Sequence, residues 1–145
     1  MKRILFLCSG NYYRSRYAEI LFNWHARQQG LRWQAESRGL ALDERNPGPI
    51  STHTTSRLAA CGIPADGYQR SPMVAVEEDF AAAQHIVAVK KAEHWPAIET
   101  HFPRWLHQVE YWHVDDLDCS TADEALPHLE AQVLSLIQRL AALDH

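Results

Sequence analysis

The feature of this sequence that most constrains its fold is an apolar run that ends in a cysteine and leads directly into a turn and a helix. Residues 4–7 read Ile-Leu-Phe-Leu, which is typical of a strand buried on both faces, and Cys8 follows them. Gly10 and Asn11 tolerate the left-handed backbone that a tight turn needs, and helix-forming residues begin at Arg14. This order predicts a strand, a turn and a helix of an α/β fold, with Cys8 at the helix N-terminus.

The turn between Cys8 and Arg14 has the composition of an anion-binding site. The first turn of a helix leaves backbone N–H groups unpaired, and the positive end of the helix dipole favours an anion there. The same field favours the thiolate form of a cysteine, which is its nucleophilic form. The guanidinium of Arg14 can bind a tetrahedral oxyanion through a two-pronged contact. These residues predict transfer of a phosphoryl group to the sulfur of Cys8; the simpler alternative is a buried core cysteine.

Strand and helix patterns alternate along the rest of the chain. We expect helices over residues 14–29, 51–61, 77–83 and 92–101, and strands over residues 33–37, 86–89 and 109–114. Ser51 or Thr52 would cap the second helix. Thr121, with Glu124 three residues on, resembles a capping box for a long last helix with one apolar face formed by Leu129, Val133, Leu136, Ile137 and Leu140.

Buried strands that alternate with helices are typical of a parallel sheet covered by helices on both faces. We therefore expect a single three-layer α/β domain over residues 1–145, with a small parallel sheet of about four strands. Such sheets bind ligands beyond the carboxyl ends of their strands, which is where Cys8 would lie.

Composition excludes several classes of protein. A net charge of −4 provides no general basic surface for nucleic acid or an anionic membrane. The N-terminal apolar run is too short for a signal peptide, and no later stretch could span a bilayer. The three cysteines and nine histidines are scattered, so we expect no disulfide framework, no metal, no cofactor and a cytoplasmic location.

Residues 8–15, Cys-Ser-Gly-Asn-Tyr-Tyr-Arg-Ser, resemble the phosphate-binding loop of the low-molecular-weight protein tyrosine phosphatases. That family also places the loop after an apolar strand near the N-terminus. Residues 36–39, Glu-Ser-Arg-Gly, lie where the family has Ser-Ala-Gly, and residues 77–80 resemble its acidic helix. Residues 112–117, Trp-His-Val-Asp-Asp-Leu, lie where an Ile-Pro-Asp-Pro segment supplies the general acid. The resemblance covers nearly the whole chain and is strong only at the loop.

The resemblance implies hydrolysis of aryl phosphate monoesters through a phosphocysteine intermediate. Cys8 would be the nucleophile and Arg14 would stabilise the phosphoryl oxygens. The other residues of the loop would complete the phosphate site: Ser9, Gly10, Asn11, Tyr12, Tyr13 and Ser15. The implied partners are a phosphotyrosine protein or a small aryl phosphate, with inhibition by phosphate-like oxyanions and no nucleic acid or membrane.

The resemblance also suggests roles for individual side chains. Two aspartates compete for the role of general acid, and the register that keeps Val114 on the buried apolar position selects Asp116 over Asp115. Asn11 would hold its unusual backbone through its side-chain amide, with Ser37 as partner. Tyr12, more than its neighbour in the loop, would wall the entrance against an aryl group.

The sequence departs from the family pattern at several positions. Tyr13 stands where many members have a second cysteine, Arg16 replaces a proline, and the acid segment lacks its prolines and following aromatic residues. A non-catalytic phosphate-binding module is therefore an alternative. A thiol-dependent arsenate reductase is a less favoured one, because it needs two neighbouring downstream cysteines and the chain has only the distant Cys61 and Cys119.

Overall fold

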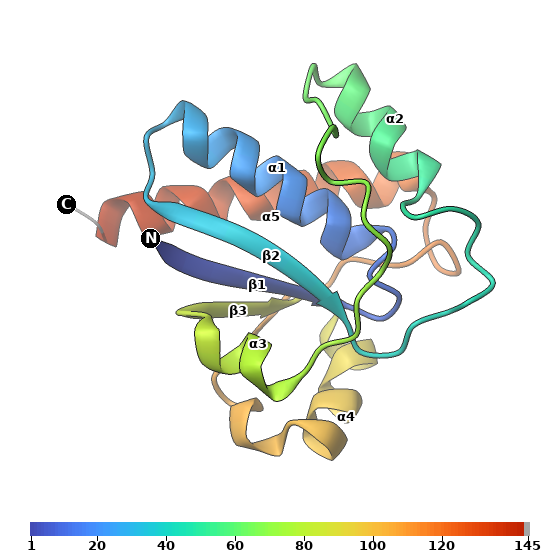
Figure 1. Ribbon diagram of the computed structural model, residues 1–145, viewed down its shortest axis with the longest axis vertical. Helices are drawn as coiled ribbons and strands as arrows, with labels where there is room; N and C mark the ends of the chain where they lie inside the picture. Colours follow the sequence, from blue (N-terminus) through green and yellow to red (C-terminus); the bar gives the residue numbers. More distant parts are fainter. Residues whose placement is uncertain (144–145) are drawn as a thin grey trace.

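Four parallel strands form the central sheet of the protein in its computed structural model, which describes residues 1–143 (Figure 1). The strands are β1 (Lys2–Cys8), β2 (Trp33–Gly39), β3 (His85–Ala88) and β4 (Glu110–Tyr111). Their order across the sheet is β2-β1-β3-β4, and each neighbouring pair is parallel. β1 is therefore an inner strand, and its carboxyl end lies between those of β2 and β3.

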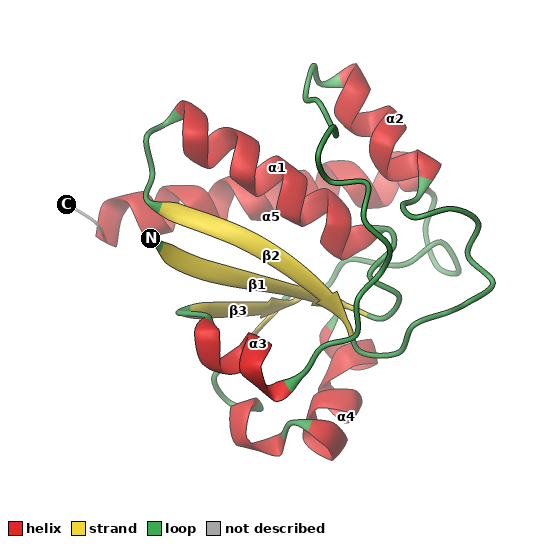
Figure 2. Ribbon diagram, viewed as in Figure 1, coloured by secondary structure: helices red, strands yellow, loops and turns green. Residues whose placement is uncertain are grey.

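Helices cover both faces of this sheet (Figure 2). α1 (Arg14–Gln28) and α5 (Ala122–Leu143) lie on one face, and α2 (Thr52–Ala60) packs near both. α3 (Glu77–Ala82), α4 (Lys91–His101) and the short 3₁₀ helix η1 (Pro103–Trp105) lie on the other. This arrangement confirms the predicted three-layer α/β fold.

The apolar run in β1 is buried on both faces because the two helical layers cover alternate side chains. Ile4 and Phe6 pack into the core shared with α1 and α5, whereas Leu5 and Leu7 pack into the core shared with α3 and α4. All four are at most 2% exposed. Burying an aliphatic or aromatic side chain stabilises a fold by about 1.5–3 kcal/mol, so this run anchors the strand that carries Cys8.

The last helix and the cap of α2 follow the sequence prediction. The predicted apolar face of α5 is buried at all five positions, Leu129, Val133, Leu136, Ile137 and Leu140. Of the two candidate caps of α2, Ser51 takes the position, and its hydroxyl accepts a hydrogen bond of 3.2 Å from the backbone N–H of His53.

The last strand is shorter than predicted. The pattern over residues 109–114 predicted a strand, but only Glu110–Tyr111 forms one. β3 ends at Ala88 and α4 begins at Lys91, so the regular parallel ladder between β3 and β4 stops there. The chain nevertheless stays beside this region, because the N–H of Trp112 bonds to Ala88 O and that of Val114 to Val89 O. These bonds bring residues 114–116 to the carboxyl edge of the sheet.

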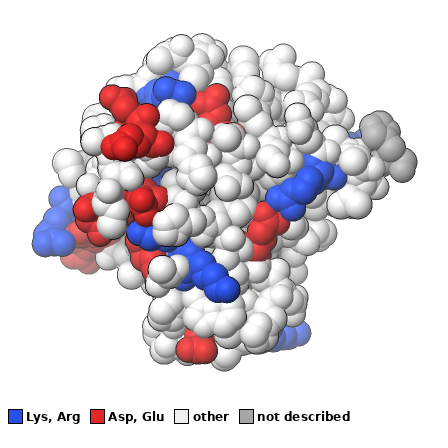
Figure 3. Space-filling model, turned by 180° about the vertical axis from the view of Figure 1, so that it is seen from behind, with Lys and Arg blue, Asp and Glu red and all other residues white. Residues whose placement is uncertain are grey.

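Acidic and basic side chains lie next to one another on the face shown in Figure 3. Attraction for a phosphate group must therefore come from a local arrangement of donors rather than from the surface as a whole. Within residues 1–143, no helix combines the length and the apolar character needed to cross a membrane.

Glu110 joins three parts of the fold, and its contacts predict that the free energy of unfolding depends on pH. Its carboxylate bonds to His85 of β3, to Arg139 of α5 and to the indole N–H of Trp112. Burial alone would raise the pKa of Glu110, but these hydrogen bonds hold it well below its usual range. The resulting stabilisation is complete above about pH 4.3, the pKa of an unfolded glutamate, and is lost as the pH falls toward the lower folded-state pKa.

We expect Glu110→Gln to lower the free energy of unfolding by about 1–2 kcal/mol at pH 7, because it weakens charge-assisted hydrogen bonds. The difference between wild type and variant should shrink as the pH falls from about 4.3 toward 3. Urea unfolding across this pH range measures both quantities. A difference that stays constant down to pH 3 would show that the Glu110 carboxylate is not the titrating group.

Candidate active site

The loop of residues 8–15, called the cysteine loop below, turns between the end of β1 and the start of α1. Asn11 adopts a φ of 50°, in the left-handed region that asparagine tolerates better than most residues. No side chain of the described residues caps the first turn of α1. The backbone N–H groups at the start of the helix are therefore left available to an anion, which is what an anion-binding loop requires.

Cys8 lies at the base of a cavity of about 250 Å³. The cavity is lined by Ser9, Gly10, Tyr12, Tyr13 and Arg14 from the loop and by Ala41, Asp43, Asn46, Ser51, Asp116 and Leu117 from other segments. Asn11 and Ser15 lie behind it, fully buried. The sulfur of Cys8 is 3.0 Å from the hydroxyl oxygen of Ser15. The structure therefore brings Asp116, which is distant in sequence, to the same cavity as Cys8 and Arg14 of the cysteine loop.

The Arg14 side chain is almost fully buried, with 1% of the residue exposed, and is held by three acceptors. Nη1 donates to Val114 O at 3.0 Å, whereas Nη2 donates to Glu93 Oε2 at 2.6 Å and to Asp116 Oδ2 at 3.3 Å. Burial would lower the pKa of Arg14, but Cys8 and the two carboxylates raise it above its ordinary value. Arg14 is therefore a permanent cation with a fixed orientation beside Cys8.

The two aspartates that competed for the role of general acid lie in different environments. Asp115 is not among the residues that line the cavity, and Lys90 and Ser120 bind its two carboxylate oxygens at 2.8 and 3.1 Å. The hydrogen bond from Lys90 is the main cause that lowers the pKa of Asp115. Asp116 lines the cavity and reaches Arg14. Of these two aspartates, Asp116 is therefore the one that can face a group bound above Cys8.

Sequence reasoning missed Glu93 and His94, which lie near the start of α4, after the carboxyl end of β3. Glu93 Oε2 accepts hydrogen bonds from Ser9 Oγ and from Arg14, and it lies 2.8 Å from His94 Nε2. Burial would raise the pKa of Glu93, but the bonds from His94, Arg14 and Ser9 hold it well below its usual range. The position of Glu93 just after a strand was the signal that could have identified it. The carboxyl ends of parallel strands share one edge of the sheet, so a carboxylate after β3 lies near Cys8 after β1.

His94 orients Glu93 rather than adding a second titrating group. Its Nδ1 accepts a hydrogen bond of 3.1 Å from the backbone N–H of Lys90, which leaves the proton on Nε2, the nitrogen beside Glu93. Burial lowers the pKa of His94 below its ordinary value, so the ring is neutral at neutral pH.

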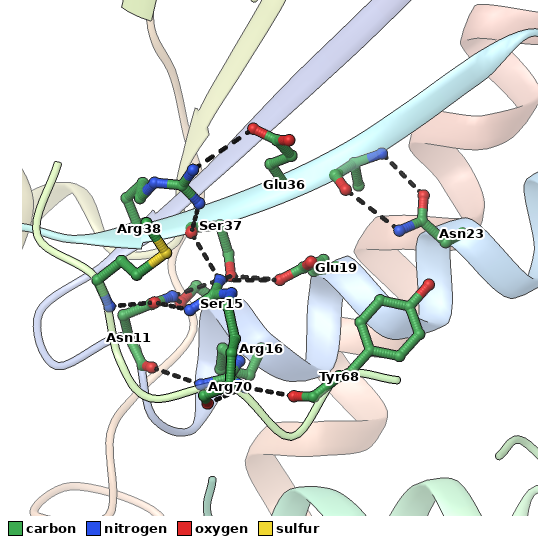
Figure 4. A network of polar contacts seen from close by, with 12 residues as sticks. Asn11, Ser15, Arg16, Glu19, Asn23, Glu36, Ser37, Arg38, Tyr68 and Arg70 are labelled. Carbon is green, nitrogen blue, oxygen red and sulfur yellow. Dashed lines mark hydrogen bonds and ion pairs between the residues drawn. The ribbon is translucent and has the colours of Figure 1, made fainter. Parts of the chain in front are cut away.

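The side chain of Asn11 holds the cysteine loop in place (Figure 4). Its Nδ2 donates to Ser15 Oγ and to Ser37 Oγ, both at 2.9 Å, which confirms the contact expected with Ser37. Its Oδ1 accepts from Arg70 Nη1 at 2.9 Å and from the N–H of Met73 at 3.0 Å. Because Ser15 Oγ accepts from Asn11, its own hydrogen is free to point to a thiolate on Cys8.

A parallel α/β sheet that presents a cysteine and an arginine on one loop, at a helix N-terminus, is the arrangement expected of a small cysteine-dependent phosphatase. The family model described as low molecular weight phosphotyrosine protein phosphatase matches residues 3–141. The chain therefore belongs to this family. Comparison with curated protein sequences gives no match.

Solved structures of the same fold cover the whole chain. YfkJ from Bacillus subtilis is 21% identical, with a TM-score of 0.87 over 100% of this chain and 98% of YfkJ. The low molecular weight protein tyrosine phosphatase SP-PTP from Streptococcus pyogenes is 22% identical, with a TM-score of 0.80 over 100% and 99% of the two chains. The YwlE arginine phosphatase from Geobacillus stearothermophilus is 24% identical, with a TM-score of 0.79 over 100% and 97%. At these identities the likeness shows the fold.

The contacts of Asn11 predict that its backbone conformation and its hydrogen bonds stabilise the protein separately. Asn11→Gly keeps access to positive φ and loses only the hydrogen bonds, whereas Asn11→Ala loses both. We expect both variants to be less stable than wild type, and Asn11→Ala to be less stable than Asn11→Gly by about 1 kcal/mol. Urea unfolding measures the difference. Equal stability of the two variants would mean that the left-handed conformation carries no cost for alanine at this position.

Proposed function

We propose that this protein hydrolyses aryl phosphate monoesters through a phosphocysteine formed on Cys8. The observation that carries the proposal is the placement of Cys8, Arg14 and Asp116 around one cavity at the N-terminus of α1. The proposal takes residues 1–145 as one catalytic domain. The free cysteines among the described residues support a cytoplasmic location as part of it.

In the first step the thiolate of Cys8 attacks phosphorus, so that a sulfur–phosphorus bond forms as the bond to the aryl oxygen breaks. The loop N–H groups and Arg14 stabilise the three equatorial oxygens, which is the main requirement of phosphoryl transfer. Asp116 acts as general acid and gives a proton to the departing oxygen.

In the second step a water molecule attacks phosphorus and Asp116 takes its proton. The sulfur–phosphorus bond breaks, and inorganic phosphate and the thiolate of Cys8 result. Ser15 assists here because its hydroxyl, 3.0 Å from the sulfur, can donate a hydrogen bond to the departing thiolate.

The aryl preference rests on the walls of the cavity. Tyr12 is half-buried, lines the cavity and is held by a hydrogen bond from its hydroxyl to Pro47 O. An aromatic ring fixed in this way can pack against an aryl leaving group. Some structural neighbours are named arginine phosphatases, so a phosphorylated guanidinium is the competing substrate class to be assayed beside the aryl ester.

Steady-state hydrolysis of nitrophenyl phosphate tests the proposal. We expect turnover by the wild type and none by Cys8→Ser, which should keep the fold and the binding of phosphate. Exposed Cys61→Ser is the matched control and should keep full activity. Phosphate binding by the wild type without turnover would instead support the non-catalytic module, and faster release of phosphate from phosphoarginine would reassign the substrate class.

Asp116→Asn should slow hydrolysis of esters with poor leaving groups much more than that of esters with good ones. A nitrophenolate leaves with little help, whereas a tyrosyl oxygen needs a proton in the transition state, and general acid catalysis contributes about 10²–10⁴-fold. Asp115→Asn is the control, because Asp115 is bound by Lys90 away from the cavity. The dependence of rate on leaving-group pKa measures the effect. A steeper dependence in the Asp115 variant alone would place the acid one residue earlier.

A further inference from the structure

Arg16 lies on the first turn of α1 and is 1% exposed, among the largest fully buried side chains of the described protein. Its four hydrogen bonds run from Nη1 to Asn11 O at 3.3 Å and Pro49 O at 3.1 Å, and from Nη2 to Tyr68 O at 2.6 Å and Arg70 O at 2.8 Å. One side chain thus ties together the cysteine loop, the segment before α2 and the segment before α3.

Arg70 continues this connection to the site (Figure 4). The backbone carbonyl of Arg70 is bound by Arg16, and its Nη1 donates to Asn11 Oδ1 at 2.9 Å. Its Nη2 donates to Ser37 O and Oγ at 2.9 and 3.1 Å. Both arginines therefore bind Asn11: Arg16 donates to its backbone oxygen and Arg70 to its side-chain oxygen. We call these two residues the arginine brace.

Burying the charged guanidinium of Arg16 costs free energy, so the brace is better explained by a functional role than by stability alone. All the hydrogen bonds that the described residues give Arg16 run to carbonyl oxygens, so none is an ion pair. Burial and the neighbouring charge of Arg70 lower the pKa of Arg16 to about 10, so it stays protonated at neutral pH. The carboxylate of Glu19 contacts Arg70 at 3.4 Å, and its charge partly opposes the lowering of the Arg16 pKa. We therefore expect the buried guanidinium of Arg16 to add little to the free energy of unfolding. Its main effect is to fix the conformation of the segments that it binds.

We propose that Arg16 is a positioning residue of the phosphate site, which acts on Asn11 directly through its backbone oxygen and indirectly through Arg70. The brace fixes the left-handed turn, which aims the loop N–H groups at the oxyanion. It also fixes the Asn11 amide, which orients Ser15 toward Cys8. The inference rests on the proposed function only in that the cysteine loop binds phosphoryl oxygens. A planar guanidinium can reach carbonyls of three segments at once, whereas one ammonium group cannot.

The experiment is a double-mutant cycle on the binding of inorganic phosphate, measured by titration calorimetry. Arg16→Lys and Arg70→Lys keep the charge and remove the fork. We expect each to weaken phosphate binding by about tenfold to a hundredfold, the range expected for a misplaced site. The double variant should bind no more weakly than the worse single variant, since both act on Asn11 in one chain of contacts.

Arg27→Lys is the matched control. Arg27 lies on the same helix and binds the same segment through the hydroxyl of Tyr68 at 2.7 Å, but it does not contact the cysteine loop. It should leave phosphate affinity unchanged. Urea unfolding of each variant confirms that binding is measured on folded protein. If Arg16→Lys does not fold, Arg70→Lys against Arg27→Lys still tests the brace.

The outcomes separate this inference from the proposed function. Three results would overturn the brace, regardless of whether the wild type hydrolyses an ester. These are unchanged phosphate affinity in Arg70→Lys, additive losses of affinity in the double variant, or an equal loss in Arg27→Lys. Weakened, non-additive phosphate binding in a protein that hydrolyses no ester would support the brace and reject the proposed function. A merely structural role would lower the free energy of unfolding and leave phosphate affinity unchanged.

Discussion

The left-handed turn at Asn11 is the constraint on which the site depends. It reverses the chain between Cys8 and the start of α1, and it is sustained by contacts that the buried Asn11 side chain makes with Ser15, Ser37, Arg70 and Met73. β1 supplies the other half of the constraint, because its apolar side chains lock the strand between two helical layers. A rigid strand and a braced turn leave the cysteine loop little freedom, which is what preorganised stabilisation of an oxyanion requires.

The positive charge near the cysteine loop comes from a few arginines rather than from the whole surface. The chain carries a net charge of −4, yet Arg14, Arg16 and Arg70 gather around the cysteine loop. Arg14 is partly neutralised by Glu93 and Asp116, and this pairing fixes its orientation. Arg16 contacts carbonyl oxygens only among the described residues, so its charge adds to the positive potential of the loop. We therefore expect this site to attract phosphate without a basic surface.

The parts of this arrangement that depend on local sequence could be predicted, and those that depend on distant contacts could not. The β1–loop–α1 unit follows from the apolar run, Asn11 and the helix start, and the α/β fold from the alternation of patterns. Asp116 was selected over Asp115 only by register with a resembling family, and the structure places it in the cavity with Cys8. Glu93 and the brace were missed because their partners lie far away in sequence and meet only in the folded chain. The last strand was predicted too long because a pattern of apolar residues does not reveal where its partner, β3, ends.

The central claim is that a phosphoryl group passes through the sulfur of Cys8. The most direct measurement is rapid acid quenching of the wild type during turnover of an aryl phosphate, followed by mass spectrometry of the peptide that contains Cys8. We expect a mass increase of one phosphoryl group on Cys8, which forms before inorganic phosphate is released and disappears when substrate is exhausted. Turnover with no phosphoryl adduct, or with the adduct on another residue such as His94, would contradict the claim.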